Sequence, residues 1–512
     1  MRVLIFHGYL LVGTGSNVYN AELGAALARA GHEVHMLCQD RDPLALEWVD
    51  ATGDWDSGAL RMTTRREPAR ATVYRPDIGG LLPLYVADRY GGTDARPFPD
   101  LTDAEVDRYV DANVAAVREV AERVRPDVAL ANHLVMGPVV LARALGDVPY
   151  AVKIHGSALE YTVKPYPRFK PYAAEGLASA RGILVGSRHT AESLWAEMND
   201  PTVDERTRLG PPGVDVVRFA PRDNEAARAG LDALTSRLET LEEAPDESSF
   251  ARSAGEAAAA LATLRPEDRV VVFVGKLIAS KGVELLLAAW PLVLAREPRA
   301  RLLVVGFGAF RAGLEGLARD LAAGDLEAAR ALRSEHGAEL PHLAAFLDSL
   351  PDPDAYRAAA AGMTVRIAWA GRLDHSELVD VLSVAEAMAV PSTFPEAFGM
   401  VAAEAAACGT LPVVANHSGL AEVARTLGAA APATARPWLT FDVGPGAVGE
   451  LADDLAAWLE APEDLRAATR AAIVAATREH YSWDGVARSV IAAAQGELDG
   501  LPRPAPDIGT SG

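Results

Sequence analysis

Cysteine is scarce in this sequence, where only Cys38 and Cys408 occur among 512 residues. Two cysteines provide no disulfide framework and no zinc motif, and such usage is typical of proteins kept in a reducing compartment. We therefore expect a cytoplasmic protein that is stabilised by hydrophobic burial, since half of its residues are hydrophobic.

Positive charge is also under-represented. The 49 lysines and arginines stand against 70 aspartates and glutamates, which gives a formal net charge of −21. A protein that follows nucleic-acid phosphates carries a basic face, so we expect no nucleic-acid partner. Any anion that this protein binds must be held by a local cluster of donors against the overall field.

Long hydrophobic runs are lacking as well. The most apolar internal run, at 285–295, is too short to span a bilayer, so no transmembrane segment is expected. The opening stretch "MRVLIFHGYLLVGTG" is interrupted by His7 and Gly8 and has no small-x-small cleavage site. These features favour a buried first strand over a signal peptide.

Short strands rich in Val, Ile and Leu alternate with helical stretches in two separate series. The first series contains "RVLIF", "EVHMLC", "DVALAN", "YAVKI" and "GILVG", and the second contains "RVVVFVG", "RLLVVG", "VRIAWAG", "AMAVPS" and "LPVVAN". Such alternation indicates parallel sheets covered by helices on both faces. The sequence therefore predicts an α/β protein with two tandem Rossmann-like domains, at 1–215 and 267–478.

Four further segments fall outside this alternation. The segment 216–266 is expected to be a linker with a helical insert that includes the acidic run "ETLEEAPDESS". An Ala-rich helical insert is expected at 320–362 within the second domain. A final helix at 479–498 is expected to cross back to the first domain, and the tail at 499–512 has a composition typical of disorder.

The stretch "STFPEAFGMVAAEAAACG" places Glu396 and Glu404 eight positions apart in apolar surroundings. Gly399 and Met400 are expected to open the helix that carries Glu404, so the two acids bracket a helix start whose N–H groups favour a phosphate. Carboxylates accept hydrogen bonds from vicinal diols, and a nucleoside-diphosphate sugar offers a diol, a diphosphate and a second diol in that order. The alternative is a capping glutamate followed by a solvent-facing one.

Two lysines, Lys276 and Lys281, lie in "VGKLIASKG" directly after the first strand of the second series. Ligands of open parallel sheets bind beyond the carboxyl ends of the strands. Two flexible point charges on one such loop suit a diphosphate, because an ammonium needs no planar partner. Two ordinary surface lysines are the alternative.

Four segments resemble the recurring blocks of the retaining GT-B glycosyltransferases of family 4: "KIHGSALEY", "PPGVDVVRFAP", "FVGKLIASKGVELLLAAW" and "PSTFPEAFGMVAAEAAACG". The blocks follow that family's order, and the resemblance extends from the N-terminus to "REHYSWDGVA". It implies the GT-B fold, in which two Rossmann-like domains have parallel sheets facing an interdomain cleft. It also implies a hexosyltransferase that moves a hexose from a nucleoside-diphosphate sugar to a sugar, sugar phosphate, inositol phosphate or lipid hydroxyl.

The resemblance assigns donor-site roles to residues of the second domain. Glu396 would hold sugar hydroxyls and Glu404 the ribose. Lys276 and Lys281 would neutralise the diphosphate, although the family more often has arginine at the position of Lys276. Leu373, after "WAGR", falls where the family's backbone contacts the base. Backbone N–H groups near the sugar and phosphate would come from Phe398, Gly399, Met400 and Val401.

The resemblance also assigns roles in the first domain. His155 in "KIHGS" matches the family histidine at a strand end near the transferred sugar. In the glycine loop "GYLLVGTGSNVYNAEL", Gly15 would approach the donor phosphate and Gly13 the acceptor. The piece "GSNVY" resembles the loop of family members that glycosylate inositol phosphate, so Asn17 would contact the acceptor.

The stretch "YTVKPYPRFKPY" combines aromatic residues with Lys164 and Arg168. One interpretation is a cationic flap over a phosphorylated acceptor, with both side chains binding it. A second is a patch that contacts a membrane surface peripherally, and a third is an ordinary exposed loop.

Two other functions stay open. A non-catalytic sensor of sugar nucleotides would show the same site in its sequence. An NAD-dependent Rossmann oxidoreductase would need G-x-G-x-x-G after the first strand, but Val18 stands in place of the third glycine, although Asp40 could serve as a ribose acid. The family reaction requires small-molecule donor and acceptor only: no cofactor is needed, and Mg²⁺ is compatible with it but not implied.

Overall fold

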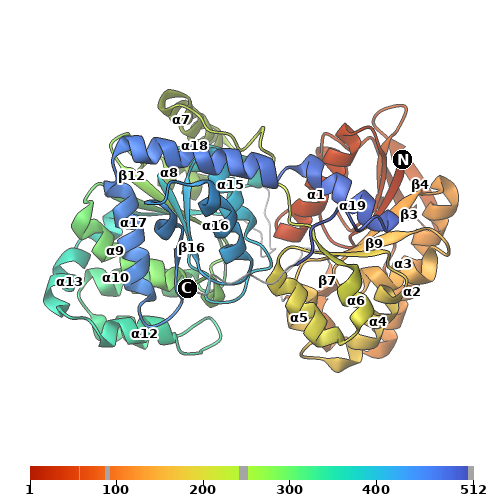
Figure 1. The fold of residues 1–512 in the computed structure, drawn as a ribbon, viewed down its shortest axis with the longest axis horizontal. Coiled ribbons are helices and arrows are strands. Elements are labelled where there is room, and N and C mark those ends of the chain that lie inside the picture. The colour runs from red at the N-terminus through yellow and green to blue at the C-terminus, as the bar shows by residue number, and fades with distance from the viewer. Residues whose placement is uncertain (57, 87–92, 242–251, 505–512) are drawn as a thin grey trace. The chain divides into compact units, whose positions relative to one another are not determined.

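The computed structural model describes residues 1–56, 58–86, 93–241 and 252–504. The chain divides into two compact units, Met1–Gly213 with Tyr481–Gly512, and Val214–His480. Each unit is built on a sheet of mostly parallel strands with helices packed against it (Figure 1). The prediction of an α/β protein with two parallel-sheet domains is therefore confirmed.

The first unit contains a nine-stranded sheet in the order β11-β10-β9-β8-β1-β2-β5-β3-β4 and a two-stranded sheet of β6 and β7. All neighbouring strands are parallel except β3 and β4, which form an antiparallel hairpin at one edge. The strands are β1 (Arg2–Phe6), β2 (Glu33–Leu37), β3 (Ala51–Asp56), β4 (Ala59–Thr64), β5 (Ala71–Arg75), β6 (Leu81–Leu84), β7 (Asp94–Pro97), β8 (Val128–Asn132), β9 (Tyr150–Ile154), β10 (Gly182–Val185) and β11 (Thr207–Leu209).

Helices of the first unit connect these strands. The longest, α2, begins with a capping box in which the Glu105 amide donates to the Thr102 hydroxyl and the Thr102 amide donates to the Glu105 carboxylate. The helices are α1 (Gly15–Arg29), α2 (Asp103–Val124), α3 (Gly137–Ala144), α4 (Lys170–Ala178), α5 (Arg188–Met198), α6 (Pro201–Arg206) and α19 (Trp483–Gln495).

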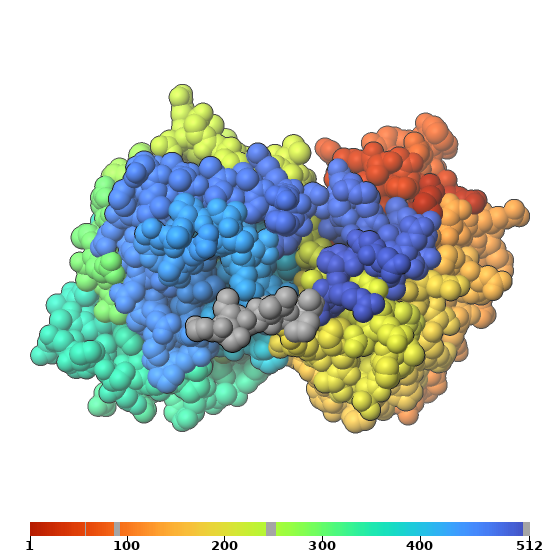
Figure 2. Space-filling model, in the orientation of Figure 1, coloured from red at the N-terminus to blue at the C-terminus, as the bar shows by residue number. Residues whose placement is uncertain are grey.

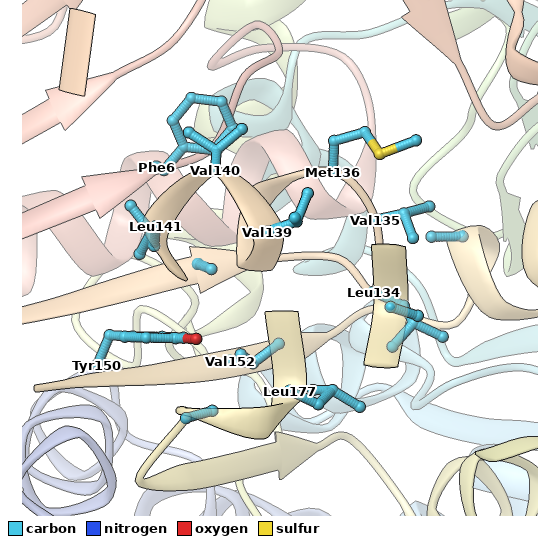
Figure 3. Close-up of a cluster of buried hydrophobic side chains, with 14 of the residues drawn as sticks. Phe6, Leu134, Val135, Met136, Val139, Val140, Leu141, Tyr150, Val152 and Leu177 are labelled. Carbon is cyan, nitrogen blue, oxygen red and sulfur yellow. The ribbon is translucent and has the colours of Figure 1, made fainter. Parts of the chain in front are cut away.

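The core of the first unit lies between its sheet and helices α2, α3 and α4. Phe6, Val140, Leu141 and Val152 are among its buried members, which come from two strands and from α3 (Figure 3). Each such side chain stabilises the fold by about 1.5–3 kcal/mol relative to exposure. Strands β8 and β9 are buried along their whole length, as continuous apolar strands of a parallel sheet should be.

The final helix, α19, belongs to the first unit although it follows the second unit in the chain. It packs against α1, β9 and β10, and Trp483 lies edge-on to Tyr19 with ring centroids 5.5 Å apart. A Cβ atom at Gly182 would come within 2.7 Å of the Ala493 carbonyl oxygen, so glycine permits this close packing. The tail predicted to be disordered is described only as far as residue 504, and 505–512 lie outside the described residues. In its described part, the Pro502 carbonyl accepts a hydrogen bond from the Leu209 amide.

The second unit contains a six-stranded parallel sheet in the order β14-β13-β12-β15-β16-β17. Its strands are β12 (Arg269–Val274), β13 (Ala300–Val305), β14 (Ile367–Gly371), β15 (Ala387–Val390), β16 (Leu411–Ala415) and β17 (Thr440–Phe441). Its helices are α7 (Asn224–Thr240), α8 (Ala254–Leu261), α9 (Val283–Arg296), α10 (Arg311–Ala322), α11 (Leu326–Ala331), α12 (Pro341–Asp348), α13 (Pro353–Ala360), α14 (Leu378–Leu382), α15 (Met400–Cys408), α16 (Ser418–Ala430), α17 (Ala447–Glu460) and α18 (Glu463–His480).

The segments that interrupt the alternation are packed parts of this second unit. Helices α7 and α8 occupy much of 216–266, and α8 packs against the edge strand β14. Most of the acidic run lies in 242–251, outside the described residues. The segment 320–362 contains the end of α10 and helices α11, α12 and α13.

Helix α18 packs against α15 and α16 on one face of the second unit, which the space-filling view in Figure 2 shows toward the reader. Cys38 and Cys408 are buried thiols that form no disulfide. Within the described ranges, no helix has the length and apolar character that a membrane crossing requires.

Candidate functional site

Strands β12 and β15 are neighbours in the second sheet, so their carboxyl ends lie together. The loop after β12 carries Lys276 and Lys281, and the loop after β15 carries Glu396. The two loops touch at Gly282, which has φ of +65°, and a Cβ atom there would lie 1.9 Å from the Pro391 carbonyl oxygen. Glycine is required at this point because any side chain would push the loops apart.

Lys281 and Glu396 form an ion pair across these loops. The Ser392 hydroxyl donates to Glu396 Oε1 at 2.7 Å, and the Glu396 amide donates to the Ser418 hydroxyl at 2.9 Å. Burial alone would raise the pKa of Glu396, but Lys281, Ser392 and the nearby His417 together hold its pKa below the ordinary value. Glu396 is therefore a carboxylate held in a defined position at neutral pH.

The serines around Glu396 are themselves held by His417, which follows β16. Its Nε2 lies 2.8 Å from the Ser392 carbonyl oxygen, and its Nδ1 lies 3.0 Å from the Ser418 hydroxyl. The donor in the first contact is the ring nitrogen, because a carbonyl oxygen can only accept. The strand ends of β15 and β16 are thus joined through one imidazole.

Helix α15 starts directly after this loop. Gly399 precedes it with φ of +112°, and Met400 and Val401 form its first turn. Phe398 is buried beside it. N–H groups in the first turn of a helix have no intrahelical acceptor and present partial positive charge, so this end of α15 suits an anion. Lys276, which is half-buried, lies on the loop after β12 that also carries Lys281.

Glu404 lies deeper in α15 and is only 3% exposed. Its Oε1 is 2.7 Å from His375 Nε2, and His375 follows Leu373 in the loop after β14. Leu373 is itself buried. The structure thus brings Glu404 next to the Leu373 loop, and the alternative of a solvent-facing glutamate does not hold.

In the first unit, His155 stands at the end of β9. Its Nε2 lies 2.8 Å from Asn132 Oδ1. The Asn132 amide group already donates to Asn20 and to the Phe6 carbonyl, so Oδ1 accepts and His155 carries its proton on Nε2. Burial and nearby His133 lower the pKa of His155 well below its ordinary value, so the ring is neutral with Nδ1 as an acceptor.

The glycine loop of the first unit is fixed from within. Asn17 is buried, its amide donates to the Val12 carbonyl at 2.6 Å, and its Oδ1 lies 3.0 Å from His7 Nε2. Gly13 is exposed in this loop, and Gly15 opens α1. Asp40 accepts a hydrogen bond from the Leu11 amide at 2.8 Å, so the carboxylate that an oxidoreductase would use for a ribose supports the loop instead.

The two cations predicted to bind the acceptor are engaged within the first unit. Lys164 pairs with Glu160 at 2.8 Å and donates to the Ser193 hydroxyl. Arg168 pairs with Asp103 at 2.9 Å and also donates to the carbonyl oxygens of Phe98, Pro99 and Leu101. Both residues therefore tether the segment 161–172, and their contact with an acceptor stays a prediction.

Several polar residues at strand ends were not predicted from the sequence. His133 follows β8 and is 2% exposed, and neither of its ring nitrogens has a hydrogen-bond partner among the described residues. Buried Lys153 donates to the Gly210 carbonyl at 2.5 Å. A usable signal was present for those at or just beyond a strand end, because ligands of a parallel sheet bind beyond the carboxyl ends of its strands. The unpredicted residues are Asn132, His133, Lys153, His375, Ser392, His417 and Ser418.

Across the part of the chain that the structure describes, no group of three or more His, Cys, Asp or Glu side chains is arranged to hold a metal ion. The recognised polar groups are instead ion pairs and hydrogen-bonded imidazoles. Their chemistry suits hydroxyls, which carboxylates and imidazoles bind, and phosphates, which lysines and helix N-termini bind.

Comparison with known proteins agrees with this chemistry. Residues 13–218 match the family described as Glycosyltransferase Family 4, and residues 352–474 match the family described as Glycosyl transferases group 1. The chain is 29% identical over 299 residues to a D-inositol 3-phosphate glycosyltransferase of Segniliparus rotundus, a match that covers 57% of this chain and 47% of that relative. The chain thus spans about half the length of this curated relative.

Solved structures share the fold. Sucrose-phosphate synthase from Thermosynechococcus elongatus is 20% identical, with a TM-score of 0.59 over 95% of this chain and 96% of that one. The Anabaena protein HepE, solved in complex with UDP, is 15% identical, with a TM-score of 0.57 over 97% of this chain and all of that one (100%). At these identities the likeness shows the fold alone.

Proposed function

This chain belongs to family 4 of the GT-B glycosyltransferases, and from that premise we propose that it is a retaining hexosyltransferase. It would move a hexose from a nucleoside-diphosphate sugar to a hydroxyl acceptor. The observation that carries the proposal is the Lys281–Glu396 pair, at the ends of two neighbouring strands and beside the start of α15. A cation, a carboxylate and a helix N-terminus within one unit are the groups that a nucleotide sugar needs.

The leaving group accounts for the positive charges. When the bond between sugar and phosphate breaks, negative charge develops on the departing diphosphate, and stabilising it is the main electrostatic task. Lys281, Lys276 and the N–H groups that open α15 supply positive potential for this step. The proposed reaction therefore requires no metal ion.

The carboxylates account for the hydroxyls. Glu396, fixed by Ser392 and Ser418, accepts hydrogen bonds from the sugar. Glu404 accepts hydrogen bonds from the ribose on the side of its carboxylate that faces away from His375. In the first unit, neutral His155 offers Nδ1 to a sugar hydroxyl. Attack of the acceptor on the same face as the leaving phosphate would retain the configuration, with that phosphate receiving the acceptor proton, so no side-chain base is assigned.

The names of similar proteins suggest a class of acceptor. The D-inositol 3-phosphate glycosyltransferases and the sucrose-phosphate synthase carry names that denote phosphorylated polyols or sugars, and we infer an acceptor of this class for the present chain. UDP is the first nucleotide to try, because the HepE structure contains it.

The test is release of nucleoside diphosphate by the full chain from UDP-glucose, UDP-N-acetylglucosamine and GDP-mannose, with inositol phosphate, glucose 6-phosphate or fructose 6-phosphate as acceptor. We expect one donor to be consumed faster when its acceptor is present. Binding of a nucleotide sugar without turnover on any acceptor would instead favour the sensor, and saturable binding of NAD would favour the oxidoreductase.

A further inference from the structure

A side chain from the segment 216–266 holds the loop that follows β14. Arg252 Nη1 lies 3.0 Å from Asp374 Oδ2 and 2.9 Å from Glu377 Oε2. The Arg252 side chain is 16% exposed and that of Glu377 is 6% exposed, so this bridge is largely sheltered from water. Glu377 Oε2 also accepts the Asp374 amide at 2.7 Å, which closes the loop on itself.

The held residues flank the part of the loop assigned to the nucleotide. Leu373, whose backbone is predicted to contact the base, immediately precedes Asp374. His375 immediately follows Asp374 and lies 2.7 Å from Glu404, the acid predicted to hold the ribose. A shift of Asp374 therefore moves both the base contact and the partner of the ribose acid.

Arg252 lies closer to Glu377 than Arg237 does. Arg237 Nη2 lies 3.4 Å from the other oxygen of Glu377 and its side chain is 54% exposed, so this second pair is longer and better screened. Arg372 binds the other oxygen of Asp374 at 2.8 Å. Without Arg252, two neighbouring carboxylates would face each other with less compensation, and the loop would rearrange to separate them.

We propose that Arg252 is a positioning residue for nucleotide recognition. It fixes Asp374 and Glu377, and through them it orients the Leu373 backbone and the His375–Glu404 pair toward the base and ribose of a nucleoside diphosphate. This inference rests on the proposed function. It also gives a role to the segment 216–266, in which Arg252 lies two residues before the start of α8.

The inference predicts a loss that is confined to the nucleoside part of the ligand. Calorimetric titration of the full chain with UDP, GDP and ADP identifies the nucleotide that the wild type binds best, and inorganic pyrophosphate serves as the probe without base or ribose. We expect Arg252→Ala to lower the affinity for the nucleotide by about 10- to 100-fold, the range for losing a hydrogen bond to a charged group. Pyrophosphate affinity should stay within about twofold, because Lys276 and Lys281 are untouched.

Turnover separates positioning from simple unfolding. Because the base and ribose contacts are made equally in ground and transition states, Arg252→Ala should raise the donor KM and leave kcat nearly unchanged. Arg252→Lys keeps the charge but cannot reach both carboxylates, so its donor KM should lie between those of the wild type and Arg252→Ala. Asp374→Asn, at a half-exposed carboxylate, removes one partner and should produce a smaller loss of the same kind.

Arg228→Ala is the matched control. Arg228 lies in the same segment, on α7, where it donates to the Leu264 carbonyl at 3.0 Å and pairs with Asp232 at 3.0 Å. We expect its nucleotide and pyrophosphate affinities to equal those of the wild type. An equal loss in Arg228→Ala and Arg252→Ala would mean that the segment acts only through general stability, and the inference would fail.

Two failures are distinguishable. If the wild type binds no nucleoside diphosphate, the proposed function is wrong and the inference falls with it. Suppose that the wild type binds one, and that both Arg252→Ala and Arg252→Lys bind it as tightly as the wild type does, or lose affinity for pyrophosphate as much as for the nucleotide. Then only the positioning role of Arg252 is wrong.

Discussion

Glu396 is a partly buried carboxylate with a proposed role in sugar binding. A buried carboxylate is costly unless a cation and hydrogen bonds compensate it, and Lys281 with Ser392 supplies that compensation. Lys281, which lowers the pKa of Glu396, is also proposed to meet the diphosphate, and Glu396 itself is proposed to meet the sugar. The proposed sugar contact is therefore held in place by residues of the protein itself.

Lys281→Met should reverse the response of this carboxylate to pH. In the wild type the pKa of Glu396 is depressed, so its stabilisation is complete above the ordinary glutamate pKa and is lost as the pH falls through the depressed one. With Lys281 gone, burial dominates and raises the pKa. We expect a melting temperature well below the wild type at neutral pH and a smaller difference near pH 4.

The control for that experiment is Glu396→Gln in the Lys281→Met background, which should remove the pH dependence of the difference. A difference in melting temperature between Lys281→Met and wild type that stays the same at all pH values would show that Lys281 does not compensate the charge of Glu396.

Lys153 gives a second prediction at the residue scale. Burial lowers the pKa of this lysine to about 7, while the unfolded chain keeps the ordinary value. The wild type therefore loses stability as the pH falls toward 7, because folding then opposes protonation. Lys153→Met should melt higher than the wild type at about pH 6, and the gain should shrink at about pH 9. A gain that is constant with pH would refute a lowered pKa for Lys153 in the folded protein.

At the scale of elements, the meeting of the β12 and β15 loops at Gly282 is the feature most sensitive to substitution. Gly282→Ala would place a Cβ atom against the Pro391 carbonyl at a positive φ. We expect a loss of more than about 2 kcal/mol, since the strained backbone alone costs about 1–2 kcal/mol. Nucleotide affinity should fall too, because Lys281 is the neighbouring residue.

Gly362 provides the matched control for Gly282. Its φ is +79°, but an added Cβ atom would meet nothing within 4 Å. Gly362→Ala should therefore show the backbone strain alone, measured as the shift of the urea midpoint, and should keep nucleotide affinity. Equal losses in both variants would show that the contact between the two loops contributes little.

A second prediction at the element scale concerns Glu386, at the turn before β15. It binds Arg269 at 2.7 Å and also Arg466 and Arg470 of α18, and its carbonyl accepts from Trp458 Nε1 at 2.8 Å. Glu386→Ala would leave Arg466, which is 4% exposed, with less compensation. We expect a loss of about 3 kcal/mol, in the range for a broken buried ion pair.

The comparison for Glu386 is an exposed ion pair of the same unit. Asp348 pairs with Arg330, and both side chains are about half exposed. Asp348→Ala should leave the urea midpoint close to that of the wild type, because solvent screens an exposed pair. If the two variants lose the same amount, the network around Glu386 does not join α18 to the sheet.

The strands that the sequence predicted differ from those that it missed in how continuous their hydrophobic residues are. The apolar central strands β1, β8, β9, β12 and β13 were found because buried parallel strands are continuous hydrophobic runs. The hairpin β3–β4, the strands β5 to β7 and the short β11 and β17 were missed. Strand β4, "ALRMTT", is half polar and largely exposed, so its sequence alone does not distinguish it from a loop.

At the scale of the whole molecule, the sequence predicted two α/β units, which follow from strand patterns, and it placed the candidate site on the loops after β12 and β15 from motif spacing. It did not predict which side chains pair within those loops. The contacts His375–Glu404 and Arg252–Glu377 join residues 29 and 125 positions apart, and no local pattern encodes such partners. Nor did it predict that α7 and α8 pack within the second unit.

The most direct test of glycosyl transfer is the initial rate of nucleoside-diphosphate release by wild type, Lys281→Met and Glu396→Gln, measured with the preferred donor and acceptor on folded protein. We predict measurable turnover by the wild type and a fall of kcat by about 100-fold or more in each variant, because each loses a charge that acts at the departing diphosphate or the sugar. Near-normal kcat in either variant would contradict the account.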